Sequence, residues 1–342
     1  MSSEGEGGPG GLDTPPSSAT RPAGAGLETP PSSAPRAAGA GLETPPSSAP
    51  RAAGAGLETP PSSAPRPAGA HGGTLALFAS ELLTLFRRRR TWALLGALAL
   101  IPVLIAVAIR VAGDAPSGRG PAFLGQITEN GLFVGVTAMV VAIPLFLPLT
   151  IGVVAGDTVA GEASHGTLRY LLIAPAGRIR LLIVKYTATA VFCAAATLTV
   201  VVVGTIIGWA LFPVGPIALL SGATVSVGEG LLRFVAIAAY VTVSLLGLSA
   251  IGLFLSTLTT VPVGAMAATA ILAVVAQIMG ALPQLEWLHP WLFTQYWLGF
   301  ADLLRQPPVL DSFADNALLQ AGYLVVFGAL AVSRMLTKDV LS

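Results

Sequence analysis

The chain has 342 residues, of which 54% are hydrophobic and only 10% are charged, whereas a soluble globular domain carries roughly 25% charged residues. The composition therefore excludes an ordinary soluble domain and indicates an integral membrane protein. The net charge of +1 gives no reason to expect a nucleic-acid partner, and the single cysteine, Cys193, excludes an intrachain disulfide or a cysteine-based metal site.

The N-terminal segment is repetitive. Residues 11–70 contain four copies of a 15-residue unit, one form of which is GLETPPSSAPRAAGA. Each copy has a single leucine and consists mostly of Pro, Ser, Ala and Gly, so it offers too little apolar surface to offset the entropy lost on ordering. We therefore expect residues 1–70 to form a disordered tail, either a spacer or a ligand for a partner, and residues 71–342 to form a transmembrane domain.

The residues after the tail predict an amphipathic helix that lies in the plane of the membrane surface. Leu75, Phe78, Leu82 and Leu85 recur at helical spacing, whereas Glu81 is expected to turn away from them. Four consecutive arginines follow, and we expect them to fix the topology and to contact anionic head groups: Arg87, Arg88, Arg89 and Arg90.

Stretches without Asp, Glu, Lys or Arg set the number of membrane spans, because a charge at the bilayer centre costs about 3 kcal/mol. A span needs about 20 residues, so the charge-free stretches 91–109, 130–156 and 316–333 each hold one helix. The stretch 186–228 holds one helix that ends near Pro213, and the stretch 234–285 holds two helices hinged near residues 256–262. The sequence therefore predicts six spans within the stretches 91–109, 130–156, 186–228, 234–285 and 316–333.

Prolines and glycines mark special positions within these spans. Pro102, Pro144 and Pro148 predict kinks, because proline lacks the N–H that a helix needs. Pairs of glycines four residues apart either allow close contact between helices or arise by chance in a glycine-rich chain; they are Gly131 and Gly135, Gly152 and Gly156, and Gly204 and Gly208.

The segment between the fifth and sixth spans, residues 283–315, is too long for a plain loop. It is rich in aromatic residues, which are typical of the boundary between membrane and water. We expect it to form short helices at the outer boundary.

The distribution of Lys and Arg predicts the orientation. An even number of spans places both termini on one side of the membrane. That side would carry ten of the lysines and arginines that follow the tail, against four on the other side. Positive charge concentrates on the cytoplasmic side, so we expect both termini in the cytoplasm of a multi-pass plasma-membrane protein.

The loop between the second and third spans, residues 156–185, reads GDTVAGEASHGTLRYLLIAPAGRIRLLIVK. Its pattern predicts a short helix over residues 159–172, capped by Asp157 or Thr158 and ended by Pro175. A cytoplasmic helix at this place could dock on a soluble partner.

This combination resembles the permease subunit of type-2 ATP-binding-cassette (ABC) exporters. The likeness rests on an in-plane helix, six spans, the segment E-x-x-x-G-T-L-R-Y-L-L at 162–172 and the segment P-x-x-R-x-R-L-L-x-x-K at 175–185. It covers about residues 75–342 and omits the repeats.

The resemblance implies that the cytoplasmic loop forms a coupling helix, which docks on a separate ABC ATPase subunit and transmits its closing movement. It also implies a second permease copy, or a homologous permease, around the substrate path, and ATP and Mg on the partner ATPase with no cofactor in this chain. The positions that the resemblance carries over are Asp157, Glu162, Gly166, Thr167, Leu168 and Arg169.

The sequence gives no sign of an enzyme. Its two lysines, Lys185 and Lys338, do not follow a glycine, so the phosphate-binding motif G-x-x-x-x-G-K-[ST] does not occur. Asp157, Ser164 and His165 lie too close together on one short segment to form a hydrolytic triad. The alternative to a transport subunit is a membrane anchor or scaffold whose N-terminal repeats recruit partners.

Overall fold

The computed structural model describes residues 70–112, 127–166, 177–219, 221–307 and 310–337. All of them belong to one compact unit, Pro65–Ser342. The predicted tail, residues 1–70, lies outside the described residues except for Ala70.

The described part of the chain is mostly helical. Six of its helices are long and apolar enough to cross a membrane: α2 (Arg89–Ala112), α5 (Phe146–Ser164), α7 (Arg178–Leu211), α8 (Val227–Leu258), α9 (Pro262–Ala281) and α10 (Asp311–Thr337). The prediction of six spans is therefore confirmed. Helix α1 (Ala70–Arg87) precedes them, and its place in the membrane plane stays a prediction.

The second predicted span is broken into two helices, α4 (Phe133–Ala142) and α5. Pro144 lies in the break, and Leu145 has a non-helical backbone with φ of −133°. Proline cannot donate the helical hydrogen bond, so the expected kink here is a full interruption. Pro102, in contrast, lies inside an uninterrupted α2.

Two helices extend beyond the charge-free stretches that predicted them. Helix α7 begins at Arg178 and therefore includes charged residues before the apolar stretch. Helix α8 begins after Ser226, whose hydroxyl accepts a hydrogen bond from the N–H of Glu229, and Glu229 then pairs with Arg233 over 2.7 Å. Between these helices, β1 (Ile217–Ala218) and β2 (Thr224–Val225) form an antiparallel pair.

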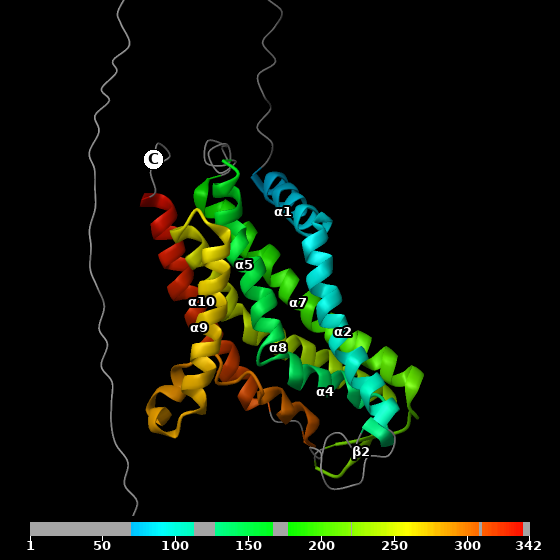
Figure 1. Ribbon diagram of the computed structural model, residues 1–342. Coiled ribbons are helices and arrows are strands. Elements are labelled where there is room, and N and C mark those ends of the chain that lie inside the picture. The colour runs from blue at the N-terminus through cyan, green and yellow to red at the C-terminus, as the bar shows by residue number, and fades with distance from the viewer. Residues whose placement is uncertain (1–69, 113–126, 167–176, 220, 308–309, 338–342) are drawn as a thin grey trace, which may run out of the picture. The chain divides into compact units, whose positions relative to one another are not determined.

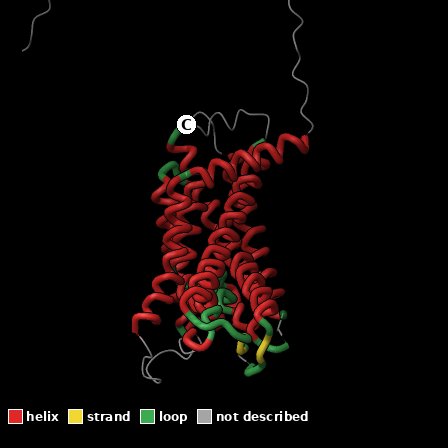
Figure 2. Tube along the Cα trace, turned by 90° about the vertical axis from the view of Figure 1, so that its right-hand side faces the viewer, coloured by secondary structure: helices red, strands yellow, loops and turns green. Residues whose placement is uncertain are grey.

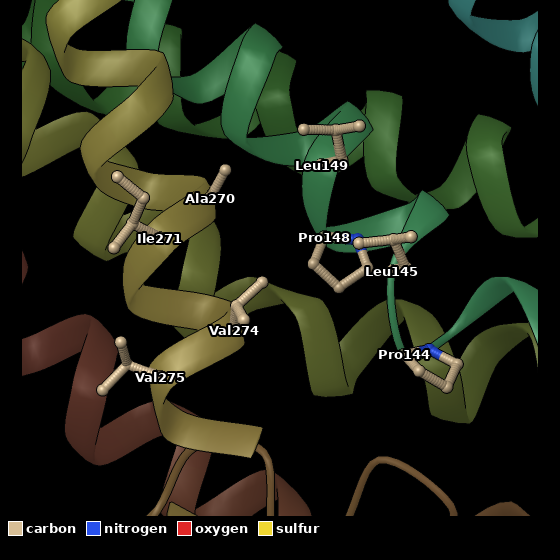
Figure 3. Close-up of a pocket in the computed structure, with 8 residues that line it drawn as sticks. All are labelled: Pro144, Leu145, Pro148, Leu149, Ala270, Ile271, Val274 and Val275. Atoms are coloured by element: carbon tan, nitrogen blue, oxygen red, sulfur yellow. The ribbon is translucent and has the colours of Figure 1, made fainter. Parts of the chain in front are cut away.

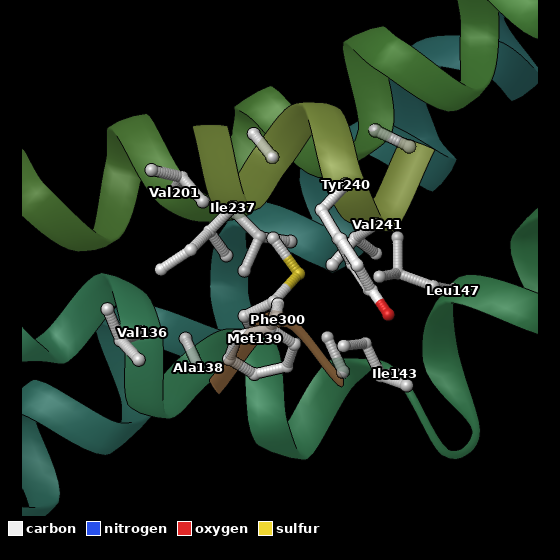
Figure 4. Close-up of a cluster of buried hydrophobic side chains, with 14 of the residues drawn as sticks. Val136, Ala138, Met139, Ile143, Leu147, Val201, Ile237, Tyr240, Val241 and Phe300 are labelled. Atoms are coloured by element: carbon white, nitrogen blue, oxygen red, sulfur yellow. The ribbon is translucent and has the colours of Figure 1, made fainter. Parts of the chain in front are cut away.

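Helix α8 packs against α5, α7, α9 and α10, while α7 also packs against α1, α2 and α4. Figure 1 shows α1 at one end of the bundle and β2 at the other, and Figure 2 shows the same bundle from the side. The main hydrophobic core includes Met139, Ile143, Ile237 and Phe300 together with the fully buried Tyr240 (Figure 4).

The spaced glycines are contact points between helices of this chain. A Cβ atom on Gly131 would overlap the backbone of Gly208, and one on Gly204 would overlap Gly135, so α4 and α7 approach each other closely. Gly156 likewise lies against the backbone of Met266 in α9. The contact interpretation of the glycine pairs is therefore confirmed.

The aromatic segment after α9 forms two short 3₁₀ helices, η1 (Pro283–Trp291) and η2 (Gly299–Leu304), as expected. Hydrogen bonds fix the segment to the bundle: the Tyr240 hydroxyl donates to the carbonyl of Tyr296, and the Trp297 ring N–H donates to the carbonyl of Ser244. The amide of Gln320 in α10 donates to the carbonyl of Phe293.

Candidate functional site

The sequence predicts that the second span ends on the cytoplasmic side. In the structure, this end of the span is the last part of α5. The structure corrects one detail of the prediction, because no new helix begins at Asp157 or Thr158; α5 runs through both residues without interruption to Ser164. The Thr158 hydroxyl bonds back to the carbonyl of Ala155 and caps nothing. Beyond Gly166, which has a positive φ of 70°, the predicted residues Thr167, Leu168 and Arg169 lie outside the described residues.

Asp157 joins α5 to the bend between α1 and α2. Its carboxylate accepts hydrogen bonds from Arg88 and from Arg90, each over 2.7 Å, and its side chain is only 11% exposed. Two of the four consecutive arginines therefore have a protein partner. Within the part of the chain that the structure describes, Asp157 makes no hydrogen bond to Ser164 or His165, and the His165 ring lies 2.6 Å from the carbonyl oxygen of Gly161.

Lys185 joins three helices. Its ammonium group donates to Glu162 of α5 over 2.5 Å and to Glu81 of α1 over 2.9 Å, and its side chain is only 1% exposed. A buried charge is tolerated only when partners offset its loss of hydration, and two carboxylates do so here. Glu81, which the sequence placed off the apolar face of its helix, therefore turns toward α7 and pairs with Lys185.

Ser256 of α8 joins the same part of α5 from the opposite side. Its fully buried hydroxyl donates to the carbonyl of Gly156 over 2.7 Å and accepts from the N–H groups of Val159 and Ala160. Gly156 and Ala160 are partners in a regular helical hydrogen bond, so the hydroxyl inserts into the hydrogen-bond ladder of α5. Such an insertion is a recognised cause of helix bending.

These contacts define a network that we call the α5 junction: Glu81, Arg88, Arg90, Asp157, Glu162, Lys185 and Ser256. It connects the end of α5 to α1, α2, α7 and α8. Sequence reasoning singled out Asp157, Glu162 and the arginines but missed Glu81, Lys185 and Ser256 as site residues. Lys185 could have been identified from its place at the edge of an apolar span, because a lysine buried there needs a partner.

The break between α4 and α5 opens an apolar pocket toward α9. It has a volume of about 220 Å³ and is lined by Pro144, Leu145, Pro148 and Leu149 on one side (Figure 3). Ala270, Ile271, Val274 and Val275 face them from α9. The described residues that line it carry no charged side chain.

Residues 77–262 match the family model described as "ABC-2 family transporter protein". The match covers just over half of the chain and includes the helices from α1 to α8 together with the whole α5 junction. No curated protein matches the chain.

Proposed function

We propose, since the chain belongs to the ABC-2 family of transporter proteins, that it is the permease subunit of an ATP-driven exporter. A separate cytoplasmic ABC ATPase subunit supplies the energy and holds ATP and Mg. This chain then carries no catalytic residue, and its task is to convert movement of the ATPase into movement of its spans.

The observation that carries the proposal is the α5 junction. A displacement at the end of α5 is passed to α1 and α7 through Glu162 and Lys185, to α2 through Asp157, and to α8 through Ser256. These contacts are short and largely buried, so α5 cannot move without moving its neighbours or breaking charged hydrogen bonds. An element with this connectivity is suited to transmit a push from outside the membrane.

The docking surface is assigned to the residues at and after the end of α5. Gly166, Thr167, Leu168 and Arg169 contact the ATPase, with Glu162 at the border. We assign Asp157 a positioning role instead of a docking role, because its carboxylate accepts hydrogen bonds from Arg88 and Arg90. It holds the coupling segment in place, while the residues beyond it touch the partner.

The substrate path lies between two permease copies. The apolar pocket between α5 and α9 supports this location. Only Ala265, Thr269, Ala273 and Ala276 of α9 are buried, so this helix presents a wide face to a second copy or to lipid. The cargo is apolar or amphiphilic, since the lining of that pocket has no charge. The protein is placed in the plasma membrane with both termini in the cytoplasm, and transport runs outward.

The test is to purify the chain from membranes with its associated ATPase and to measure complex formation and ATP hydrolysis. A Leu168→Asp variant is expected to lose the ATPase, because it places a charge in the apolar part of the docking surface. The matched control is Leu310→Asp, which changes a leucine that is 61% exposed just before α10, at the η1 and η2 end of the bundle. If Leu168→Asp keeps the ATPase bound and active, the docking assignment is wrong.

A further inference from the structure

A second and larger pocket shares no residue with the α5 junction. It has a volume of about 590 Å³ and lies between α10 and the end of η1. Pockets for small molecules in proteins occupy about 300 to 1,000 Å³. This pocket, which we call the α10 groove, is therefore large enough to hold a ligand, and it is open along one side.

Aromatic side chains form part of the wall of the α10 groove. Tyr323 and Phe327 stack with a 1° angle between their rings, and Phe293 packs edge-on against Tyr323. The Tyr323 hydroxyl donates to the carbonyl of Trp291 over 2.7 Å, which holds η1 against α10. These contacts are internal to the protein and fix the position of η1 relative to α10.

The groove lies on a poorly buried face of α10. The buried residues of α10 are only Asn316, Gln320, Ala331 and Met335. Leu318 and Val326, which line the groove, are 76% and 54% exposed. An apolar helix face of this kind inside a membrane is covered by acyl chains or by another protein.

The length and depth of the groove match one leaflet. It extends along α10 from Asp315 to Phe327, which at 1.5 Å per residue is about 18 Å. Half of the hydrocarbon core of a bilayer is about 15 Å. Asp315 immediately precedes the charge-free part of α10, so it lies at the depth of the head groups when the apolar part is in the membrane.

The charge of the groove selects the head group. Asp315 is the one charged residue among the described residues that line it, and its side chain is exposed. The rings of Trp291 and Tyr296 share the lining, and aromatic rings attract cations. A carboxylate and aromatic rings together favour an ammonium group and disfavour an anionic head group.

We propose that the α10 groove binds a phospholipid with an ammonium head group, in the leaflet on the η1 side of the protein. The acyl chain lies along Leu318, Val326 and Phe327, and the ammonium group lies beside Asp315. This site is separate from the α5 junction, and its occupancy does not depend on the ATPase or on transport.

The test uses the full chain in vesicles that contain phosphatidylethanolamine and phosphatidylglycerol in equal amounts, with bromine on the acyl chains of one lipid or of the other. Bromine quenches nearby tryptophan fluorescence, and the two vesicle types differ only in which head group carries the label. The signal of Trp291 is taken as the difference between the native chain and a Trp291→Phe variant. We expect quenching of Trp291 to be about threefold stronger with brominated phosphatidylethanolamine.

Two matched variants accompany the test. Asp315→Asn is expected to bring the ratio close to one, whereas Asp311→Asn, at an exposed acid outside the groove, keeps it. The signal of Trp287, which is 73% exposed on η1 but does not line the groove, is expected to show no preference. Equal quenching by both lipids, a preference that survives Asp315→Asn, or no quenching of Trp291 at all because protein covers the groove would each overturn the proposal.

Discussion

Lys185 of α7 donates a hydrogen bond to Glu162 of α5 over 2.5 Å, and the lysine side chain is 1% exposed. Glu81 of α1 accepts a second bond from the same ammonium group. Since the three residues come from three helices, the end of α5 is held by charge as well as by apolar packing.

Removing the lysine charge is expected to be costly. Lys185→Met leaves Glu81 and Glu162 without their shared cation, and loss of one partner of a buried pair costs about 3 to 5 kcal/mol. The free energy of unfolding in detergent would show this loss. Arg305→Met is the control, because its pair with Asp302 is largely exposed and should contribute little. A Lys185→Met protein as stable as the native chain would contradict the structural role of the α5 junction.

The hydroxyl of Ser256 is expected to matter more for coupling than for stability. In Ser256→Ala, the backbone groups of Gly156 and Ala160 can bond to each other, so the unfolding free energy should fall by only about 1 kcal/mol. The connection between α8 and α5 is lost, however, and ATP hydrolysis by the complex should respond less to cargo. Thr150→Ala removes a hydroxyl that bonds only within α5 and serves as the control. Equal effects of the two variants on hydrolysis would show that Ser256 has no part in transmission.

The glycine contacts between α4 and α7 predict a steric effect. Gly208→Ala places a methyl group against the backbone of Gly131, which cannot give way as a flexible side chain would. We expect a loss of about 1 to 3 kcal/mol, typical of overpacking. Gly96→Ala in α2 has nothing within 4 Å of the new methyl group and should be neutral or slightly stabilising. Thermal unfolding of the two variants in the same detergent measures the difference.

Deleting residues 1–69 separates transport from scaffolding. The whole α5 junction and all six candidate spans lie after this segment, so the shortened chain is expected to fold, to bind the ATPase and to support hydrolysis at close to the native rate. A scaffold that works through its repeats would lose its activity. Loss of ATPase binding in a well-folded shortened chain would favour that alternative.

The number of spans could be predicted because it depends on local composition alone. The exact extent of α7 and α8 could not be predicted. The charge-free stretches stop at Lys185 and Glu229, whereas the helices include both residues. These charges are tolerated for reasons that are not local to the apolar pattern: Lys185 has distant partners, and Glu229 belongs to a helix cap and an i, i+4 pair.

The candidate site was predictable only in part. The end of α5 was identified, but the pairing of Asp157 with Arg88 joins residues 69 positions apart, and that of Lys185 with Glu81 joins residues 104 positions apart. Spacing along one helix carries no information on such pairs. The same holds for Ser256, which is an ordinary serine in an apolar span until the fold places it against the backbone of α5.

The proposed function requires an ATPase to act on this chain through the segment that follows α5. The most direct measurement is crosslinking in intact membranes, with Cys193→Ser as the background because that cysteine is buried and unique. Leu168→Cys in this background is expected to give a product with an ABC ATPase under a short bifunctional reagent, whereas Leu310→Cys is not. If Leu168→Cys gives no such product, or if both positions give it equally, the segment after α5 is not the contact through which the protein is driven.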